Sequence, residues 1–167
     1  MFPDTTLQLA RDLLAASELR GVRLATAESC TGGLIAGCLT EIAGSSAVVD
    51  RGYVIYDNRA KVEMLGVLET TLATDGAVSE ATAREMVEGA LVRSGCGLAV
   101  AVTGIAGPGG GSEAKPVGLV HIAAAARGGE TLHERHLFPG DRSAIRLATV
   151  EAALALARLS LDAGAYP

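Results

Sequence analysis

The segment CGLAVAVTG, residues 96 to 104, constrains the fold more than any other part of the chain. It is almost continuously apolar, which is typical of a strand in a sheet that is covered on both faces. Such strands alternate along the chain with segments of helical periodicity. We therefore predict an α/β fold, specifically a three-layer α/β/α sandwich built on one sheet.

The remaining elements are predicted from apolar spacing and from the residues that begin and end helices. Ser79 and Asp141 are placed to cap helices, and Gly21, Gly44 and Gly95 are placed to end them. Two late strands with RGG between them predict a hairpin, so the sheet is expected to be mixed but mostly parallel. Helices are expected at 5–20, 33–44, 78–95 and 140–162, short helices or turns at 58–67 and 68–76, and strands at 22–29, 45–58, 96–104, 119–126 and 130–138. The strand within 45–58 is predicted to be buried.

Size and composition narrow the class of protein. A chain of 167 residues fits one domain, expected to cover 1–167. The net charge of -5, with charges interspersed, and an aromatic content of 3% argue against a nucleic-acid partner or an anionic membrane surface. No signal peptide or membrane-spanning run is expected, so we predict a soluble, cytoplasmic protein. The mean hydropathy of +0.34 favours a homo-oligomer, of unpredicted order, that buries apolar surface.

The stretch TAESCTGG, residues 26 to 33, places Ser29 between a predicted strand and a predicted helix. At a helix N-terminus its hydroxyl can act as a nucleophile beside backbone N–H groups that stabilise an oxyanion. Position alone favours the other interpretation, in which Ser29 is only a helix cap. Ala27 and Thr31 exclude the Gly-x-Ser-x-Gly elbow of an α/β-hydrolase. Cys30 is interpreted as a small buried residue rather than a nucleophile.

A serine nucleophile needs a base, and the histidines are poor candidates. His121, His133 and His136 are predicted on strands, the last two on opposite faces, as solvated side chains with no metal to bind. The stretch YVIYDNRAK instead offers Lys61, whose pKa burial can lower, beside Tyr56. An ordinary solvated lysine and a strand tyrosine remain the alternative.

The second glycine-rich stretch, TGIAGPGGGSEAKPVG, begins at Thr103. Its glycines allow backbone N–H groups to converge on an anion or a carbonyl oxygen, although a surface loop has the same composition. The stretch matches neither a phosphate-binding P-loop nor a dinucleotide fingerprint. Arg142, at the start of the last predicted helix, is a candidate for binding a phosphate.

Taken together, TAESCTGG, AGSSAVVDRGYVIYDNRAK, GAVSEATA, TGIAGPGGGSEAKPVG and the final GDR resemble the C-terminal domain of the competence-damage-inducible CinA family, over about residues 5 to 160. Stand-alone members of this family are nicotinamide-nucleotide amidases. The resemblance implies hydrolysis of nicotinamide mononucleotide (NMN) to nicotinate mononucleotide and ammonia, in the salvage of pyridine nucleotides. It also implies a Ser-Lys mechanism without metal or cofactor.

Transferred to this sequence, the resemblance implies that Ser29 attacks, that Lys61 takes its proton and that Tyr56 assists. The substrate is then expected to be held by a larger set of residues around the two glycine-rich stretches. The oxyanion is assigned to N–H groups of Cys30, Thr31, Gly32 and Gly33, the ribose or carboxamide to Glu28, Thr103, Gly104, Ala106 and Gly107, and the 5′-phosphate to Arg142.

Two alternatives to the NMN amidase remain open. One is a non-catalytic nucleotide-binding module linked to competence or to DNA damage, and the other is an amidase with a different substrate. Full-length CinA proteins carry an additional N-terminal pyrophosphatase domain, for which this chain has no room, so only the deamidase half is expected.

Overall fold

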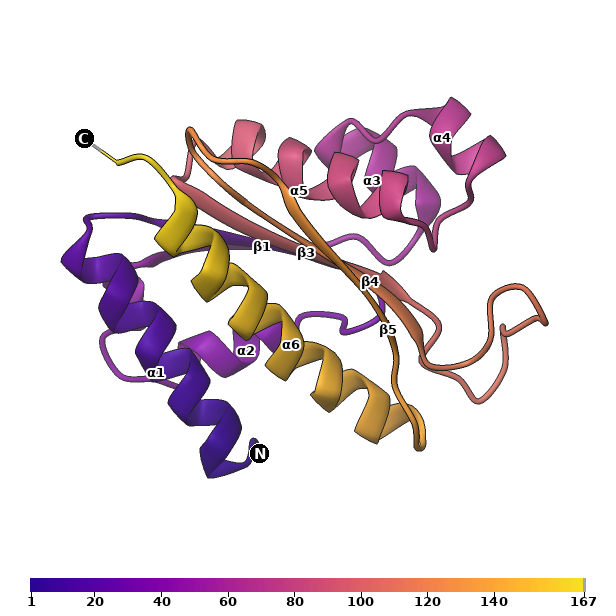
Figure 1. Cartoon of the computed structure of the whole chain (residues 1–167), viewed down its shortest axis with the longest axis horizontal. Helices are drawn as coiled ribbons and strands as arrows, with labels where there is room; N and C mark the ends of the chain where they lie inside the picture. Colours follow the sequence, from indigo (N-terminus) through magenta and orange to yellow (C-terminus); the bar gives the residue numbers. More distant parts are fainter. Residues whose placement is uncertain (167) are drawn as a thin grey trace.

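The computed structural model describes residues 1–166 and is a three-layer α/β/α sandwich, as predicted. Figure 1 shows one sheet with helices α1, α2 and α6 on one face and α3, α4 and α5 on the other. The helices are α1 (Asp4–Leu19), α2 (Leu34–Thr40), α3 (Asn58–Leu65), α4 (Glu69–Thr74), α5 (Glu80–Ser94) and α6 (Arg142–Ala163), with a short 3-10 helix at Ser45–Ala47. The strands are β1 (Leu24–Glu28), β2 (Val49–Val54), β3 (Leu98–Gly104), β4 (Leu119–Ala126) and β5 (Leu132–Leu137).

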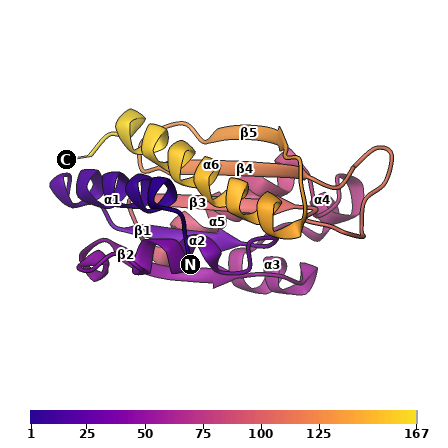
Figure 2. The same cartoon turned by 90° about the horizontal axis from the view of Figure 1, so that it is seen from below.

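The sheet has the strand order β2-β1-β3-β4-β5, which Figure 2 shows from one edge to the other. β1 pairs in parallel with both β2 and β3, whereas β4 is antiparallel to β3 and to β5. β4 is therefore the one strand that runs against the other four. The expectation of a mixed, mostly parallel sheet is confirmed.

Two apolar cores form on the two faces of the sheet, and the alternation of side chains along the strands separates them. Along β3, Leu98, Val100 and Val102 face the core under α1, α2 and α6. Ala99 and Ala101 face the core under α5. This period of two is what a strand imposes, and it explains why the apolar run is continuous in sequence.

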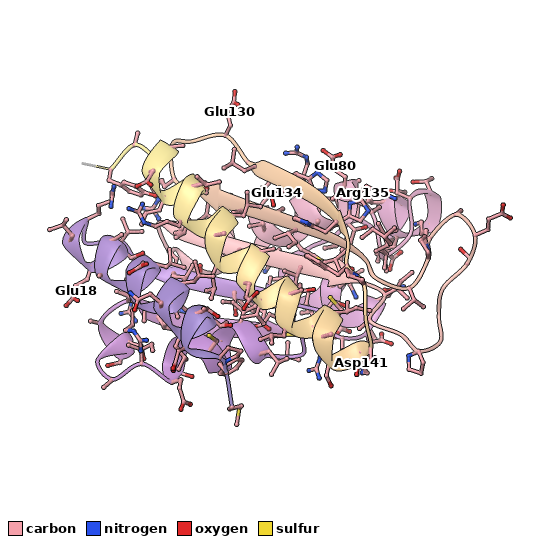
Figure 3. All side chains as sticks on the ribbon, turned by 60° about the horizontal axis from the view of Figure 1, so that its bottom comes forward. Glu18, Glu80, Glu130, Glu134, Arg135 and Asp141 are labelled. Carbon is pink, nitrogen blue, oxygen red and sulfur yellow. The ribbon has the colours of Figure 1, made fainter. Side chains whose placement is uncertain are left out.

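Several helix ends agree with the sequence. Ser79 caps α5 by accepting the N–H of Thr82, and Asp141 caps α6 by accepting the N–H of Ala144. Gly95 ends α5 in the left-handed conformation. In Figure 3, Asp141 lies at the start of α6, at the opposite end of β5 from Glu130 in the β4–β5 turn.

Three local expectations are wrong. β2 is an edge strand with half-buried and exposed residues, so the prediction of a buried strand fails there. α2 ends at Thr40 rather than at Gly44, and Gly44 instead precedes the 3-10 helix. Ser29 is not a helix cap, because α2 begins at Leu34 with Gly33 in the cap position.

The connections explain where a ligand can bind. The chain leaves β1 toward β2 through α2 on one face of the sheet, and it reaches β3 from β2 through helices on the other face. A crevice then opens beyond the carboxyl ends of β1 and β3, which is where α/β proteins of this topology bind ligands. Within residues 1–166, no helix combines the length and apolarity needed to cross a bilayer.

Candidate active site

A pocket of about 230 Å³ lies at this crevice. Its walls come from the ends of β1 and β3, from the segment after β2, from α3, from the turn before α5 and from the start of α6. It is lined by Ser29, Cys30, Tyr56, Asn58, Lys61, Ala77, Val78, Thr103, Gly104, Ala106 and Arg142. Eight of these residues were expected from the sequence to take part in catalysis or binding, namely Ser29, Cys30, Tyr56, Lys61, Thr103, Gly104, Ala106 and Arg142.

Ser29 follows β1 directly and is held by its main chain. Its N–H donates to the carbonyl of Val102 (3.1 Å), and its own carbonyl accepts the N–H of Gly32 (3.1 Å). Ser29 lines the pocket and is only 9% exposed. The sheet thus presents this hydroxyl to the pocket on a fixed backbone.

Lys61 lines the same pocket and is 1% exposed, which is rare for a lysine. Its Nζ donates to the main-chain carbonyl of Ile55 (3.2 Å) and lies 3.5 Å from Oδ1 of Asn58. Burial lowers the pKa of Lys61, and the negative charge of Asp57 opposes that shift only in part. Among residues 1–166, Nζ makes no hydrogen bond to Ser29, although both groups face one cavity.

Glu28 is completely buried but belongs to the protein framework rather than to the pocket. Its carboxylate accepts five hydrogen bonds. The donors are the hydroxyls of Thr26 and Thr31 and the N–H groups of Gly33, Ile35 and Ala36. Glu28 thereby replaces a local cap at the start of α2, and its carboxylate is directed at the protein main chain and hydroxyls rather than into the pocket where ribose or carboxamide was expected.

The same hydrogen bonds narrow the choice of oxyanion donors. The N–H of Gly32 is used by Ser29, and the N–H of Gly33 is used by Glu28, so neither is available. Gly32, Gly33 and Thr31 do not line the pocket, and the hydroxyl of Thr31 donates to Glu28. In the part of the chain that the structure describes, the N–H groups of Cys30 and Thr31 have no main-chain or carboxylate acceptor and face only the thiol of Cys30, which is a weak acceptor.

Arg146 supports this turn from α6. Its Nε donates to the carbonyl of Cys30 (3.2 Å), and its Nη2 donates to that of Thr31 (2.6 Å). These contacts fix the orientation of the two peptide groups beside Ser29. The sequence indicated no role for Arg146, because nothing in the α6 segment predicts which helix face meets the turn.

Arg142 and Tyr56 meet at the rim of the pocket. Arg142 donates to the carbonyl of Gly107 (2.8 Å) and to the phenol oxygen of Tyr56 (3.1 Å). Tyr56 is 62% exposed, so it lies at the mouth of the pocket. Arg142 therefore links the glycine-rich loop to the segment after β2, and Gly107 contributes to this link without lining the cavity.

Only the first part of the glycine-rich stretch belongs to the pocket. Thr103, Gly104 and Ala106 line it, whereas the exposed residues from 108 onward project away as the long loop in Figure 1. The expected convergence of Gly109, Gly110 and Gly111 on the site does not occur. The hydroxyl of Thr103 donates to the carbonyl of Ala77 (2.7 Å) and so attaches the turn before α5 to the pocket wall.

Asn58, Ala77 and Val78 are pocket residues that the sequence analysis missed. Asn58 stood inside the quoted YVIYDNRAK stretch, three residues before Lys61, so helical spacing was the available signal. Ala77 and Val78 carry no reactive group, and only the fold brings their turn to the ends of the strands.

Cys30 is buried, and burial raises the pKa of its thiol to about 12. Such a thiol stays protonated at neutral pH and is a poor nucleophile. This supports its interpretation as a small buried residue.

The histidines form a separate cluster on the antiparallel side of the sheet. His121 is 8% exposed rather than solvated, and its Nδ1 lies 3.0 Å from Nε2 of His133. Glu80 approaches the other nitrogen of His133 at 3.5 Å. None of these residues lines the pocket. Within residues 1–166, no three His, Cys, Asp or Glu side chains are grouped to hold a metal ion.

Comparison with known proteins identifies the family. The model of the CinA C-terminal domain matches residues 6–161, nearly the whole chain. This chain belongs to the CinA C-terminal domain family.

Members of the family that resemble this chain include both short and long proteins. Nicotinamide-nucleotide amidohydrolase PncC of Escherichia coli strain K12 is 51% identical over 140 residues, which cover 84% of this chain and 85% of that protein. A CinA-like protein of Akkermansia muciniphila is 57% identical over 134 residues, 80% of this chain but only 32% of that protein. This chain therefore spans about a third of the length of the Akkermansia relative.

Solved structures show the same fold. The competence/damage inducible protein CihA from Agrobacterium tumefaciens superposes with a TM-score of 0.94 and is 57% identical, with 97% of this chain and 98% of that chain covered. A competence damage-inducible protein A from Klebsiella pneumoniae superposes with a TM-score of 0.89 at 41% identity, over 94% and 97% of the two chains.

Proposed function

We propose that this protein is an amidohydrolase that converts NMN to nicotinate mononucleotide and ammonia, with Ser29 as the nucleophile and Lys61 as the base. The observation that carries the proposal is the buried amine of Lys61, with its lowered pKa, in the same pocket as Ser29. The name of the Escherichia coli relative, nicotinamide-nucleotide amidohydrolase, supports the choice of substrate. The reaction belongs to pyridine-nucleotide salvage, in the cytoplasm.

The charges around the pocket suit this substrate. NMN carries a cationic pyridinium ring and an anionic phosphate. A neutral Lys61 does not repel the ring, whereas an ammonium would. Arg142, at the rim, uses two of its five N–H donors on Gly107 and Tyr56, and the others can bind a phosphate at the mouth.

In the first half of the reaction, Lys61 Nζ takes the proton of Ser29 as Oγ bonds to the amide carbon. The electron pair of the carbonyl moves to its oxygen, which accepts a hydrogen bond from the N–H group of Cys30, a residue that lines the pocket. When the tetrahedral intermediate collapses, the C–N bond breaks and the leaving nitrogen takes the proton back from Lys61 or through Tyr56. Ammonia departs and leaves an ester on Ser29.

In the second half, Lys61 takes a proton from water as the water oxygen attacks the ester carbon. The C–O bond to Ser29 breaks, Ser29 Oγ recovers a proton, and nicotinate mononucleotide is released. Each proton that Lys61 accepts is thus returned within the same half-reaction, and no metal or cofactor takes part.

The test is the rate of ammonia release from NMN. Ser29→Ala is expected to lower kcat by about 10³-fold or more, because it removes the atom that forms the covalent bond. Ser46→Ala, an exposed serine remote from the pocket, is the matched control and should keep the parental rate. Release by Ser29→Ala at the parental rate would refute the mechanism, and turnover of plain nicotinamide in preference to NMN would refute the substrate.

We also propose that the protein assembles as a homo-oligomer. Large apolar side chains that remain exposed on this chain, such as Val54, Met64 and Leu68, are candidates for contact surfaces. Light scattering after size exclusion tests this, and a monomeric mass would contradict it.

A further inference from the structure

The amine of Lys61 is held by two oxygens from the segment that leads into its own helix. Ile55 lies just after β2 and supplies a buried main-chain carbonyl at 3.2 Å. Asn58 is the first residue of α3 and supplies Oδ1 at 3.5 Å. Residues three apart lie on one face of a helix, so the backbone of α3 itself places Asn58 beside Lys61.

The number of acceptors matches a neutral amine better than an ammonium. A neutral amine has two N–H hydrogens and one lone pair, whereas an ammonium has three N–H hydrogens and no lone pair. Within residues 1–166, Nζ has two hydrogen-bond partners. In a neutral amine that donates both hydrogens to these two oxygens, the bond to Cε takes the third direction around the nitrogen, so the orientation of the lone pair is fixed as the fourth.

We propose that Asn58, together with the carbonyl of Ile55, holds the neutral amine of Lys61 so that its lone pair is directed at Ser29. Asn58 is then a positioning residue for the base and not a catalytic residue, since it acts through Lys61. This inference rests on the function proposed above. It assigns a role to a pocket residue whose side chain is otherwise exposed at the rim.

The charged and titratable groups around Lys61 determine how the proposal can be tested. Asp57, the cap of α3, lies nearby and raises the pKa of Lys61, and burial outweighs it. Cys30 faces Lys61 from the turn after β1, and its raised pKa keeps it neutral. Tyr56 and Arg142 belong to the same pocket at its rim. A carboxylate at position 58 therefore adds a negative charge beside the amine while it keeps an acceptor oxygen there.

Two substitutions at Asn58 separate positioning from general support of the fold. Asn58→Ala removes the acceptor and should lower kcat about 10-fold to 100-fold with KM nearly unchanged, because the base loses its alignment. Asn58→Asp keeps the acceptor and should move the acid limb of the pH–rate profile upward by about one pH unit or more, since a nearby negative charge favours the ammonium. Above that limb, its kcat should return to nearly the parental value, and that of Asn58→Ala should not.

The matched control is Arg59→Gln, which lowers the net charge by the same single unit one residue further along α3. Arg59 is exposed and pairs with Glu63, away from Lys61. Its variant should keep the parental kcat and the parental pH profile. A kcat of Asn58→Ala within twofold of the parent, or an acid limb of Asn58→Asp that coincides with that of Arg59→Gln, would overturn the inference.

A measurement without substrate distinguishes this inference from the proposed function. The titration of Lys61, followed by NMR in protein with labelled lysine, should move to higher pH in Asn58→Asp and not in Arg59→Gln. If the parental chain releases no ammonia from NMN, the proposed function fails, and the titration still decides whether Asn58 controls the amine. If ammonia is released and neither variant at position 58 differs from the control, the inference alone fails.

Discussion

Glu28 and Lys61 are both buried ionisable residues near Ser29, yet their surroundings differ completely. The carboxylate of Glu28 accepts five hydrogen bonds and lies outside the pocket. The amine of Lys61 has two acceptors, one of them at 3.5 Å, and lies in the pocket wall. Burial alone therefore does not separate a structural group from a reactive one.

What separates them is whether the hydrogen-bonding capacity of the charged form is satisfied. A carboxylate that accepts several hydrogen bonds is stabilised in place and contributes to folding. An amine that is buried with few acceptors is pushed toward its neutral form, which is the form that can take a proton. We accordingly expect substitutions at Glu28 to change stability and substitutions at Lys61 to change activity.

The largest effect is expected for Lys61→Met, which keeps the apolar stem and removes the amine. Ammonia release from NMN should fall by about 10³-fold or more, because the base is lost. The free energy of unfolding should stay within about 1 kcal/mol of the parental value or rise, since a poorly solvated amine is removed. Lys115→Met, which changes the other lysine of the chain, should keep the parental rate. An equal loss of rate in Lys115→Met would contradict the assignment of the base to Lys61.

Glu28→Ala should act on the fold instead. Removal of the carboxylate leaves three buried or half-buried N–H groups and two hydroxyls without their acceptor, which should cost about 3 kcal/mol or more in unfolding free energy. Denaturant titration measures this. Glu41→Ala, at the exposed end of α2, should change the unfolding free energy by less than about 0.5 kcal/mol. Equal stabilities of the two variants would contradict the structural role of Glu28.

His121 is a third buried ionisable group, and it lies outside the pocket, so we expect it to affect stability rather than activity. Burial and the neighbouring His133 lower the pKa of His121 from 6.5 to about 4. The unfolded chain therefore binds a proton below pH 6.5 that the folded chain binds only below pH 4. The free energy of unfolding should therefore fall by up to about 3 kcal/mol as the pH is lowered from 6.5 to about 4.

Thermal denaturation across this pH range tests the role of His121. His121→Gln should flatten the fall in stability, whereas His136→Gln, at a histidine hydrogen-bonded to Glu134, should preserve it. Parallel curves for His121→Gln and the parent would show that another group controls the acid sensitivity.

The layers of the fold were predictable from the sequence because each element shows its environment in its own residues. The apolar run of β3, the caps Ser79 and Asp141 and the glycine after α5 are local signals, and each is confirmed. The edge position of β2 was not predictable in this way. Its valines and tyrosine have strand propensity wherever the strand lies, and strand order depends on how distant segments pair.

Some residues of the candidate site were likewise predictable from the sequence, and others were not. The resemblance of its motifs to a family singled out Ser29 and Lys61, and the structure places both in one pocket. The role of Glu28 could not be predicted, because four of its five donors come from the turn and the helix that follow β1, and only the folded chain brings them around the carboxylate. Arg146 was missed for a related reason, since its contacts join α6 to a turn more than a hundred residues earlier.

The proposed mechanism depends most directly on the protonation state of Lys61. Protein labelled with ¹³C at the lysine ε position gives signals from only Lys61 and Lys115, and the Lys115→Arg variant assigns them. The structure predicts that Lys61 titrates below the ordinary lysine pKa of 10.5, because burial disfavours its charged form. A midpoint for Lys61 at or above 10.5 would leave the amine protonated at neutral pH and would contradict its role as the base.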